Sequence, residues 1–272
     1  MSPVIAFIGG GNMAASLIGG LLAAGRPATS LRVAEISAER RDWLAREYGV
    51  EVFAQPAEAA SGAGAVVLAV KPQQMREACA GLRLAPGTVV VSIAAGVRLD
   101  SLRRWLGDAV HCVRCMPNTP ALLGAGITGL CAPAQTPAEA RQLAEDILRA
   151  AGSCVWLDDE AQMDAVTALS GSGPAYYFLL TEVLREAGVR LGLAPDVAAQ
   201  LALQTFVGAA RMADGDTDVA ELRRRVTSKG GTTEAAVTHL QTAGLQRIFD
   251  DALAAAARRG AELGAQIDSG NP

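Results

Sequence analysis

From residue 4 to residue 14 the chain reads Val-Ile-Ala-Phe-Ile-Gly-Gly-Gly-Asn-Met-Ala. The first five residues are apolar and mostly β-branched, which predicts a short strand at 4–8. The glycine run that follows fits the pattern G-x-G-x-x-A and opens a predicted helix at 14–24. Gly9 and Gly11 permit a tight bend and let the backbone approach a pyrophosphate at a helix N-terminus. Strand, glycine turn and helix in this order predict a dinucleotide-binding site.

Beyond this stretch, apolar runs that predict strands alternate with helical patterns up to about residue 158. Such alternation predicts a mostly parallel, doubly wound sheet of the Rossmann type. Only helical patterns rich in alanine, leucine and arginine follow. We therefore expect a dinucleotide-binding domain at 1–158 and an all-helical substrate and dimerisation domain at 159–272, its apolar helices covered by a partner subunit. Further strands are expected at 31–34, 65–70, 88–93, 110–115, 127–132 and 154–157, and helices at 38–48, 99–106, 137–150, 160–169, 174–191, 196–213, 218–226 and 233–264.

The composition excludes several classes of protein. The 272 residues carry a net charge of −4 with scattered cations, which argues against binding to nucleic acid. No apolar run reaches the length of a membrane span, and the start shows no basic segment or cleavage site. An odd number of cysteines, five, favours reduced, buried thiols, and Cys112 and Cys115 fit a core role better than a redox or zinc site. We expect a cytoplasmic protein that needs no metal.

Glu35, at the end of the second predicted strand, leaves the choice of dinucleotide open. Its carboxylate can accept the ribose hydroxyls of NAD and repel the 2′-phosphate of NADP. Ser37, Arg40 and Arg41 follow closely and could instead hold that phosphate. An exposed glutamate with no ligand is equally compatible with the sequence.

Three loops leave the carboxyl ends of predicted strands, at 69–72, 92–96 and 114–120. Ligands bind at this edge in open α/β sheets, and small or proline-fixed residues there suit a flat nicotinamide ring. A fourth segment, Lys229-Gly230-Gly231-Thr232-Thr233, precedes the last predicted helix. Its successive amides and the positive helix end can hold a carboxylate, and the hydroxyl of Thr233 lies beside that anion.

Five motifs together resemble those of pyrroline-5-carboxylate reductase. They are the glycine turn at 9–13, Ala69-Val-Lys-Pro, Met116-Pro-Asn-Thr-Pro, Ser170-Gly-Ser-Gly-Pro-Ala-Tyr and Arg225-Val-Thr-Ser-Lys-Gly-Gly-Thr-Thr. The resemblance covers the whole chain in the right order. It implies reduction of 1-pyrroline-5-carboxylate to L-proline, the last step of proline biosynthesis, by hydride transfer from NADPH or NADH. A cyclic imine is basic enough to be partly protonated near neutral pH, so a hydroxyl that orients its nitrogen suffices.

The resemblance also implies roles for individual residues and an assembly. Thr233 is expected to be catalytic, with its hydroxyl reaching the ring nitrogen. A homodimer is expected, often built into a ring of five dimers. Two residues depart from the family pattern. Pro56 stands where Asn is frequent, and Glu35 stands where Ser or Asn is frequent. Substrate-binding residues would be Ser228, Gly230, Gly231, Thr232, Thr233 and Glu160, and cofactor-binding residues Gly9, Gly11, Asn12, Met13, Glu35, Ala69, Val70, Lys71, Pro72, Ala94 and Ala95.

Two other functions share parts of this pattern. A β-hydroxyacid dehydrogenase has the same two-domain plan, but it needs a lysine on the first helix of the second domain, and no lysine lies between Asp164 and Arg185. A catalytically silent dinucleotide-binding sensor has no need of Thr233 or of a complete substrate loop. Both fit the sequence less well than the reductase.

Overall fold

The computed structural model describes residues 3–269, which separate into two compact units. The first, here called the sheet unit, comprises the described residues up to Ser172 together with those from Ala256 onward. The second, the helical unit, is Gly173–Ala255.

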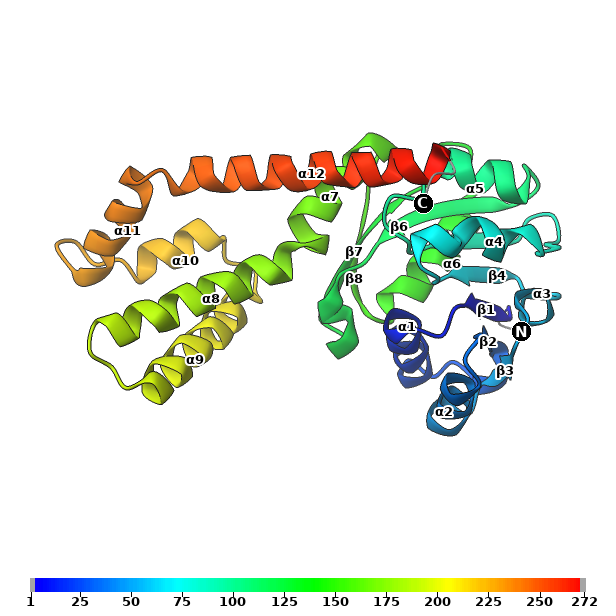
Figure 1. The fold of residues 1–272 in the computed structure, drawn as a ribbon, viewed down its shortest axis with the longest axis horizontal. Helices are drawn as coiled ribbons and strands as arrows, with labels where there is room; N and C mark the ends of the chain where they lie inside the picture. The colour runs from blue at the N-terminus through cyan, green and yellow to red at the C-terminus, as the bar shows by residue number, and fades with distance from the viewer. Residues whose placement is uncertain (1–2, 270–272) are drawn as a thin grey trace. The chain divides into compact units, whose positions relative to one another are not determined.

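Within the described residues the sheet unit contains one eight-stranded sheet with the order β3-β2-β1-β4-β5-β6-β7-β8 (Figure 1). Neighbouring strands are parallel except β6 and β7, which are antiparallel. The strand order reverses between β1 and β4, where open α/β sheets bind ligands. The strands are β1 (Ile5–Ile8), β2 (Leu31–Ala34), β3 (Glu51–Phe53), β4 (Ala65–Leu68), β5 (Val89–Ser92), β6 (His111–Met116), β7 (Gly126–Cys131) and β8 (Gly152–Trp156).

Helices cover both faces of this sheet, which explains why the central strands are apolar on both sides. Phe7 of β1 belongs to a core with α1, α2 and α6, whereas Ile8 belongs to a second core with α3, α4 and α5. The helices of this unit are α1 (Asn12–Ala23), α2 (Ala38–Tyr48), α3 (Pro56–Ala60), α4 (Met75–Ala80), α5 (Leu99–Leu106), α6 (Ala138–Arg149) and α7 (Met163–Val166), with 3₁₀ turns η1 (Ala28–Ser30), η2 (Pro72–Gln74), η3 (Thr119–Leu123) and η4 (Glu160–Gln162) and the π-helical turn η5 (Thr167–Gly171).

The helical unit consists of packed helices joined by short turns. Helix α8 (Gly173–Arg190) packs against α9 (Pro195–Ala213), and the ring of Tyr177 stacks on that of Phe206 with centroids 5.8 Å apart. Helices α10 (Val219–Arg225) and α11 (Thr232–Thr242) follow. Helix α12 (Leu245–Ser269) begins in this unit, and its last turns belong to the sheet unit. None of the helices in residues 3–269 is both long and apolar enough to cross a membrane.

The doubly wound fold class and its helical continuation are confirmed, and all seven predicted strands are present within two residues of their expected bounds. One strand was not predicted, the three-residue β3, which begins at Glu51 and is not fully buried. The single helix expected at 233–264 is wrong. The chain forms α11 and α12 there, because Gly244 adopts a left-handed φ of 84° between them. The helix expected at 160–169 is a succession of η4, α7 and η5.

Candidate active site

A cavity of about 610 Å³ lies at the carboxyl ends of β1, β2 and β4, and we refer to it as the strand-end cavity. Six of the predicted cofactor-binding residues line it: Gly9, Gly11, Glu35, Ala69, Val70 and Lys71. The segment after β3, which contains Pro56, also contributes to its wall. That segment supplies Ala54, Gln55, Pro56 and Ala57, and further lining residues are Ile8, Ala34, Ile36, Gln74, Glu77, Ala78 and Gly81.

The glycine turn between β1 and α1 forms one wall of the strand-end cavity. Gly9 has a φ of 98°, and a Cβ there would lie 2.7 Å from the carbonyl oxygen of Ala69. A Cβ on Gly11 would meet no atom within 4 Å. Gly11 precedes α1, which begins at Asn12 and receives no side-chain cap. The first amides of α1 therefore keep the anion-binding capacity of a helix N-terminus.

Glu35 follows β2 and its carboxylate is held by backbone amides. Gly10 N donates to Glu35 Oε2 at 2.9 Å, and Ser37 N donates to Oε1 at 2.9 Å. The two arginines that follow are engaged elsewhere. Arg40 Nε donates to the carbonyl of Gly10 at 2.7 Å, and its guanidinium stacks over Trp43. Arg41 donates to the carbonyls of Glu35 and Ile36.

A second cavity, of about 310 Å³, lies next to the ends of β4 and β5. Pro72 and Ala95, both predicted to contact nicotinamide, are among its lining residues, with Asp164 and Thr167. Ala94 is buried in the core behind them. Asn12 and Met13, in the first turn of α1, are not among the lining residues of either cavity.

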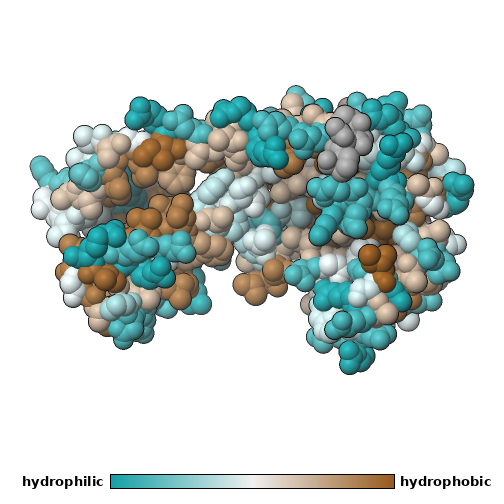
Figure 2. Space-filling model, in the orientation of Figure 1, coloured by the Kyte–Doolittle hydropathy of each residue, from teal (hydrophilic) through white to brown (hydrophobic). Residues whose placement is uncertain are grey.

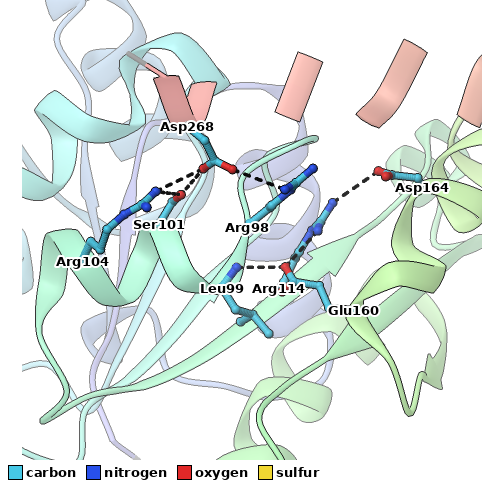
Figure 3. Close-up of polar contacts among 8 residues, drawn as sticks. All are labelled: Arg98, Leu99, Ser101, Arg104, Arg114, Glu160, Asp164 and Asp268. Carbon is cyan, nitrogen blue, oxygen red and sulfur yellow. Dashed lines mark hydrogen bonds and ion pairs between the residues drawn. The ribbon is translucent and has the colours of Figure 1, made fainter. Parts of the chain in front are cut away.

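Arg114, the first residue of the predicted 114–120 loop, was given no role of its own from the sequence, and it joins three segments of the sheet unit (Figure 3). It extends from β6 and its side chain is only 6% exposed. Its Nη1 donates to Glu160 Oε1 at 2.9 Å, and its Nη2 lies 3.7 Å from Asp164 Oδ1. The same oxygen of Glu160 accepts from Leu99 N at 2.9 Å, at the start of α5. Glu160 thus links the segment after Ala94 and Ala95 to β6.

The end of α12 is fixed to α5 by a second set of polar contacts, also drawn in Figure 3. Asp268 accepts a hydrogen bond from Ser101 Oγ. Its carboxylate also lies 3.4 Å from Arg104 Nη2 and 3.6 Å from Arg98 Nη1. These contacts hold the last turns of α12 beside the loop that contains Ala95.

The predicted substrate loop lies in the helical unit between α10 and α11. Gly230 has a φ of 73°, and Gly231 N donates to the carbonyl of Ser228 at 3.0 Å. Helix α11 begins at Thr232, with Thr233 in its first turn. The first amides of a helix have no acceptor within it, so those of Thr232 and Thr233 suit an anion. The amide of Gly230 is already used, because it donates to Glu234 Oε2 at 2.6 Å.

The cysteines are free and serve the core, as predicted for Cys112 and Cys115. Burial raises the pKa of the Cys112 thiol to about 11 and holds that of Cys115 well above its usual range. Such thiols stay protonated and unreactive near neutral pH.

Comparison with known proteins gives two family matches. Residues 160–263 match a family described as pyrroline-5-carboxylate reductase dimerisation, and residues 4–96 match one described as NADP oxidoreductase coenzyme F420-dependent. The chain is 52% identical to the pyrroline-5-carboxylate reductase of Pseudomonas aeruginosa over 269 residues, 98% of each protein. It is 40% identical to that of Haemophilus influenzae, over 96% of this chain and 97% of the relative.

Solved structures give the same result. A pyrroline-5-carboxylate reductase from Coxiella burnetii matches with a TM-score of 0.92 and 42% identity, over 97% of this chain and 99% of that one. The Plasmodium falciparum pyrroline carboxylate reductase, solved with NADP bound, matches with a TM-score of 0.81 and 27% identity, over 97% and 98%.

Proposed function

Since the chain belongs to the pyrroline-5-carboxylate reductase family, we propose that its sheet unit holds a nicotinamide dinucleotide and its 228–233 loop holds the substrate. The chain is an oxidoreductase that reduces 1-pyrroline-5-carboxylate to L-proline with NADPH or NADH. The observation that carries the assignment is the 52% identity over 98% of both proteins.

The strand-end cavity fits the cofactor. The open space beside Gly11 and the uncapped start of α1 suit a pyrophosphate, with Asn12 and Met13 in the first turn of that helix. Ala69, Val70, Lys71, Pro72, Ala94 and Ala95 lie at or near the ends of β4 and β5 and are assigned to the nicotinamide. When bound, the reduced nicotinamide supplies the hydride.

The substrate carboxylate is assigned to the first amides of α11, at Thr232 and Thr233, with Ser228, Gly230 and Gly231 shaping the turn before them. The amide of Gly230 becomes available to the substrate only if Glu234 releases it. Thr233 Oγ1 is assigned to the ring nitrogen, which it orients while the adjacent carbon gains hydride. Glu160 is assigned a supporting role in substrate binding, as the family resemblance implies, and its carboxylate accepts hydrogen bonds from Arg114 and from Leu99 N.

The residues that match the dimerisation family, 160–263, include the whole helical unit. Several large apolar side chains of α8 are more than half exposed, among them Tyr177, Phe178 and Leu184, and they suit burial in a homodimer. Five such dimers in a ring are the assembly we expect. We assign residues 1–158 to the dinucleotide-binding domain and 159–272 to the substrate and dimerisation domain. Five free cysteines, four of them buried, fit an enzyme of the cytoplasm.

Replacement of Thr233 by Ala tests the proposed mechanism. The expected loss in kcat is roughly tenfold to a thousandfold, with a smaller rise in KM, because one positioned hydrogen bond to the reacting nitrogen contributes about 1.4–4 kcal/mol. Initial rates of NADH and NADPH oxidation with 1-pyrroline-5-carboxylate measure it. Thr233→Ser keeps a hydroxyl and should recover most of the loss. Near-wild-type turnover in Thr233→Ala excludes this residue from the mechanism, and absence of turnover in the unmodified protein overturns the function itself.

A further inference from the structure

The carboxylate of Glu35 is fixed at the edge of the strand-end cavity rather than free to move. Each of its oxygens accepts a backbone amide at 2.9 Å, one from the glycine turn and one from the residue before α2. Glu35 is part-buried, and it lines the cavity at the end of β2. A carboxylate oxygen has a second lone pair, so each can still accept a hydroxyl.

The groups near this place that could hold a phosphate each make contacts within the protein, and both arginines keep further N–H groups. Ser37 N is bound to Glu35, and Ser37 Oγ accepts from Arg40 N to cap α2. The guanidinium of Arg40 donates to Gly10 O and lies 4.1 Å from the centre of the Trp43 ring. Arg41 donates to two backbone carbonyls. Neither arginine is among the residues that line the cavity, and Ile36, which is, brings no donor in its side chain.

Three charged side chains line the strand-end cavity: Glu35, Lys71 and Glu77. Lys71 follows β4, and β1 separates β4 from β2. Two strand spacings put roughly 10 Å between the ends of β2 and β4. Among the charged side chains that line the cavity, the one nearest to the end of β2 is therefore the negatively charged Glu35.

We propose that this enzyme selects NADH over NADPH and that Glu35 is the residue that makes the selection. The two cofactors differ only at the adenosine ribose, where NADH has a hydroxyl that donates to a carboxylate and NADPH has a phosphate that only accepts. That phosphate carries nearly two negative charges at neutral pH. At a few ångströms from a carboxylate it costs roughly tenfold to a hundredfold in affinity. The inference rests on the cofactor site proposed above.

Cofactor binding without substrate tests the proposal independently of catalysis. Dissociation constants for NADH and NADPH are measured by fluorescence titration at low and high salt. We expect the unmodified protein to bind NADH at least tenfold more tightly, with a difference that shrinks as salt screens the repulsion. Glu35→Ser should reduce the ratio of the dissociation constant for NADPH to that for NADH at least tenfold. If Glu35 has only a structural role, Glu35→Ser weakens the binding of both cofactors equally and leaves the ratio of their dissociation constants unchanged.

Three variants serve as controls. Glu39→Ser removes a negative charge from the exposed first turn of α2 and should keep the ratio of the unmodified protein. Arg40→Ala and Arg41→Ala should also keep it, because both side chains bind backbone carbonyls. Equal or tighter binding of NADPH by the unmodified protein overturns the proposal. An unchanged ratio of dissociation constants in Glu35→Ser also overturns it, as does a selective loss of NADPH binding in either arginine variant. A protein that binds NADH selectively but does not reduce 1-pyrroline-5-carboxylate contradicts the proposed function and leaves this inference intact.

Discussion

Gly9 and Gly11 lie two residues apart in the same turn, yet a side chain at each has a different consequence. At Gly9 a Cβ would clash with the carbonyl of Ala69, and the φ of 98° is strained for any other residue. At Gly11 the φ is −64° and a Cβ would enter open space. The fold therefore requires the first glycine, whereas a requirement for the second would have to come from a ligand that approaches the turn.

Gly11→Val should abolish tight cofactor binding while the protein stays folded, because the side chain would occupy the space left for the pyrophosphate. Fluorescence titration with NADH measures the loss, and thermal unfolding should give a Tm close to that of the unmodified protein. Gly9→Val is the matched comparison and should lower the Tm as well, since backbone strain at such a position costs about 1–3 kcal/mol. Tight binding of NADH by folded Gly11→Val would show that the turn has a different role.

Individual site residues differ in how far the sequence predicts them. The glycine turn and Glu35 are predictable because their spacing from a strand end is local. Arg114 is not, since its partner Glu160 lies 46 residues away and only the folded chain brings them together. Its neighbours Val113 and Cys115 also make the segment read as an ordinary core strand.

At the scale of elements, periodicity predicts the long helices and the buried strands of the sheet. It does not predict β3, because three residues that are not fully buried give no pattern to detect. Neither does it show where the last helical stretch breaks, because a glycine inside a helical pattern is often tolerated and Gly244 is left-handed only in the folded chain.

The contact between β6 and η4 depends on one buried cation. Arg114→Ala should lower the free energy of unfolding by about 1.5–3 kcal/mol, because the partly exposed carboxylates of Glu160 and Asp164 would lose the guanidinium that compensates them. Urea unfolding monitored by circular dichroism measures the change. Arg103→Ala removes a guanidinium paired with Asp108 on the surface, where the arginine side chain is 62% exposed, and should cost less than about 1 kcal/mol. Equal losses of unfolding free energy in the two variants would mean that the buried ion pairs of Arg114 stabilise the fold no more than an exposed pair does.

At the scale of the whole molecule, the two units differ in how well they cover their own apolar side chains. The sheet unit encloses two cores, and Ile267 of α12 packs against one of them. In the helical unit many large apolar side chains remain exposed, and Figure 2 shows apolar residues gathered at several places over its helices. The sequence predicts this excess from composition alone. It does not predict that α12 returns to the sheet unit, because a continuous helical pattern carries no sign of which core its end will join.

The exposed face of α8 predicts that the protein associates. Phe178 and Leu184 are each 60% exposed, and a fully buried side chain of this kind contributes about 1.5–3 kcal/mol. We expect sedimentation velocity to find at least a dimer even after dilution to nanomolar concentration, as large apolar interfaces allow.

Leu184→Glu should raise the dissociation constant of the dimer about a hundredfold or more, because it removes that apolar contribution and places an unpaired charge in the interface. Arg46→Glu, on the exposed surface of α2, adds a carboxylate in the sheet unit and should leave the assembly unchanged. An unmodified protein that is monomeric and fully active would rule out α8 as an interface, and equal dissociation of the two variants would show that charge rather than the apolar face governs assembly.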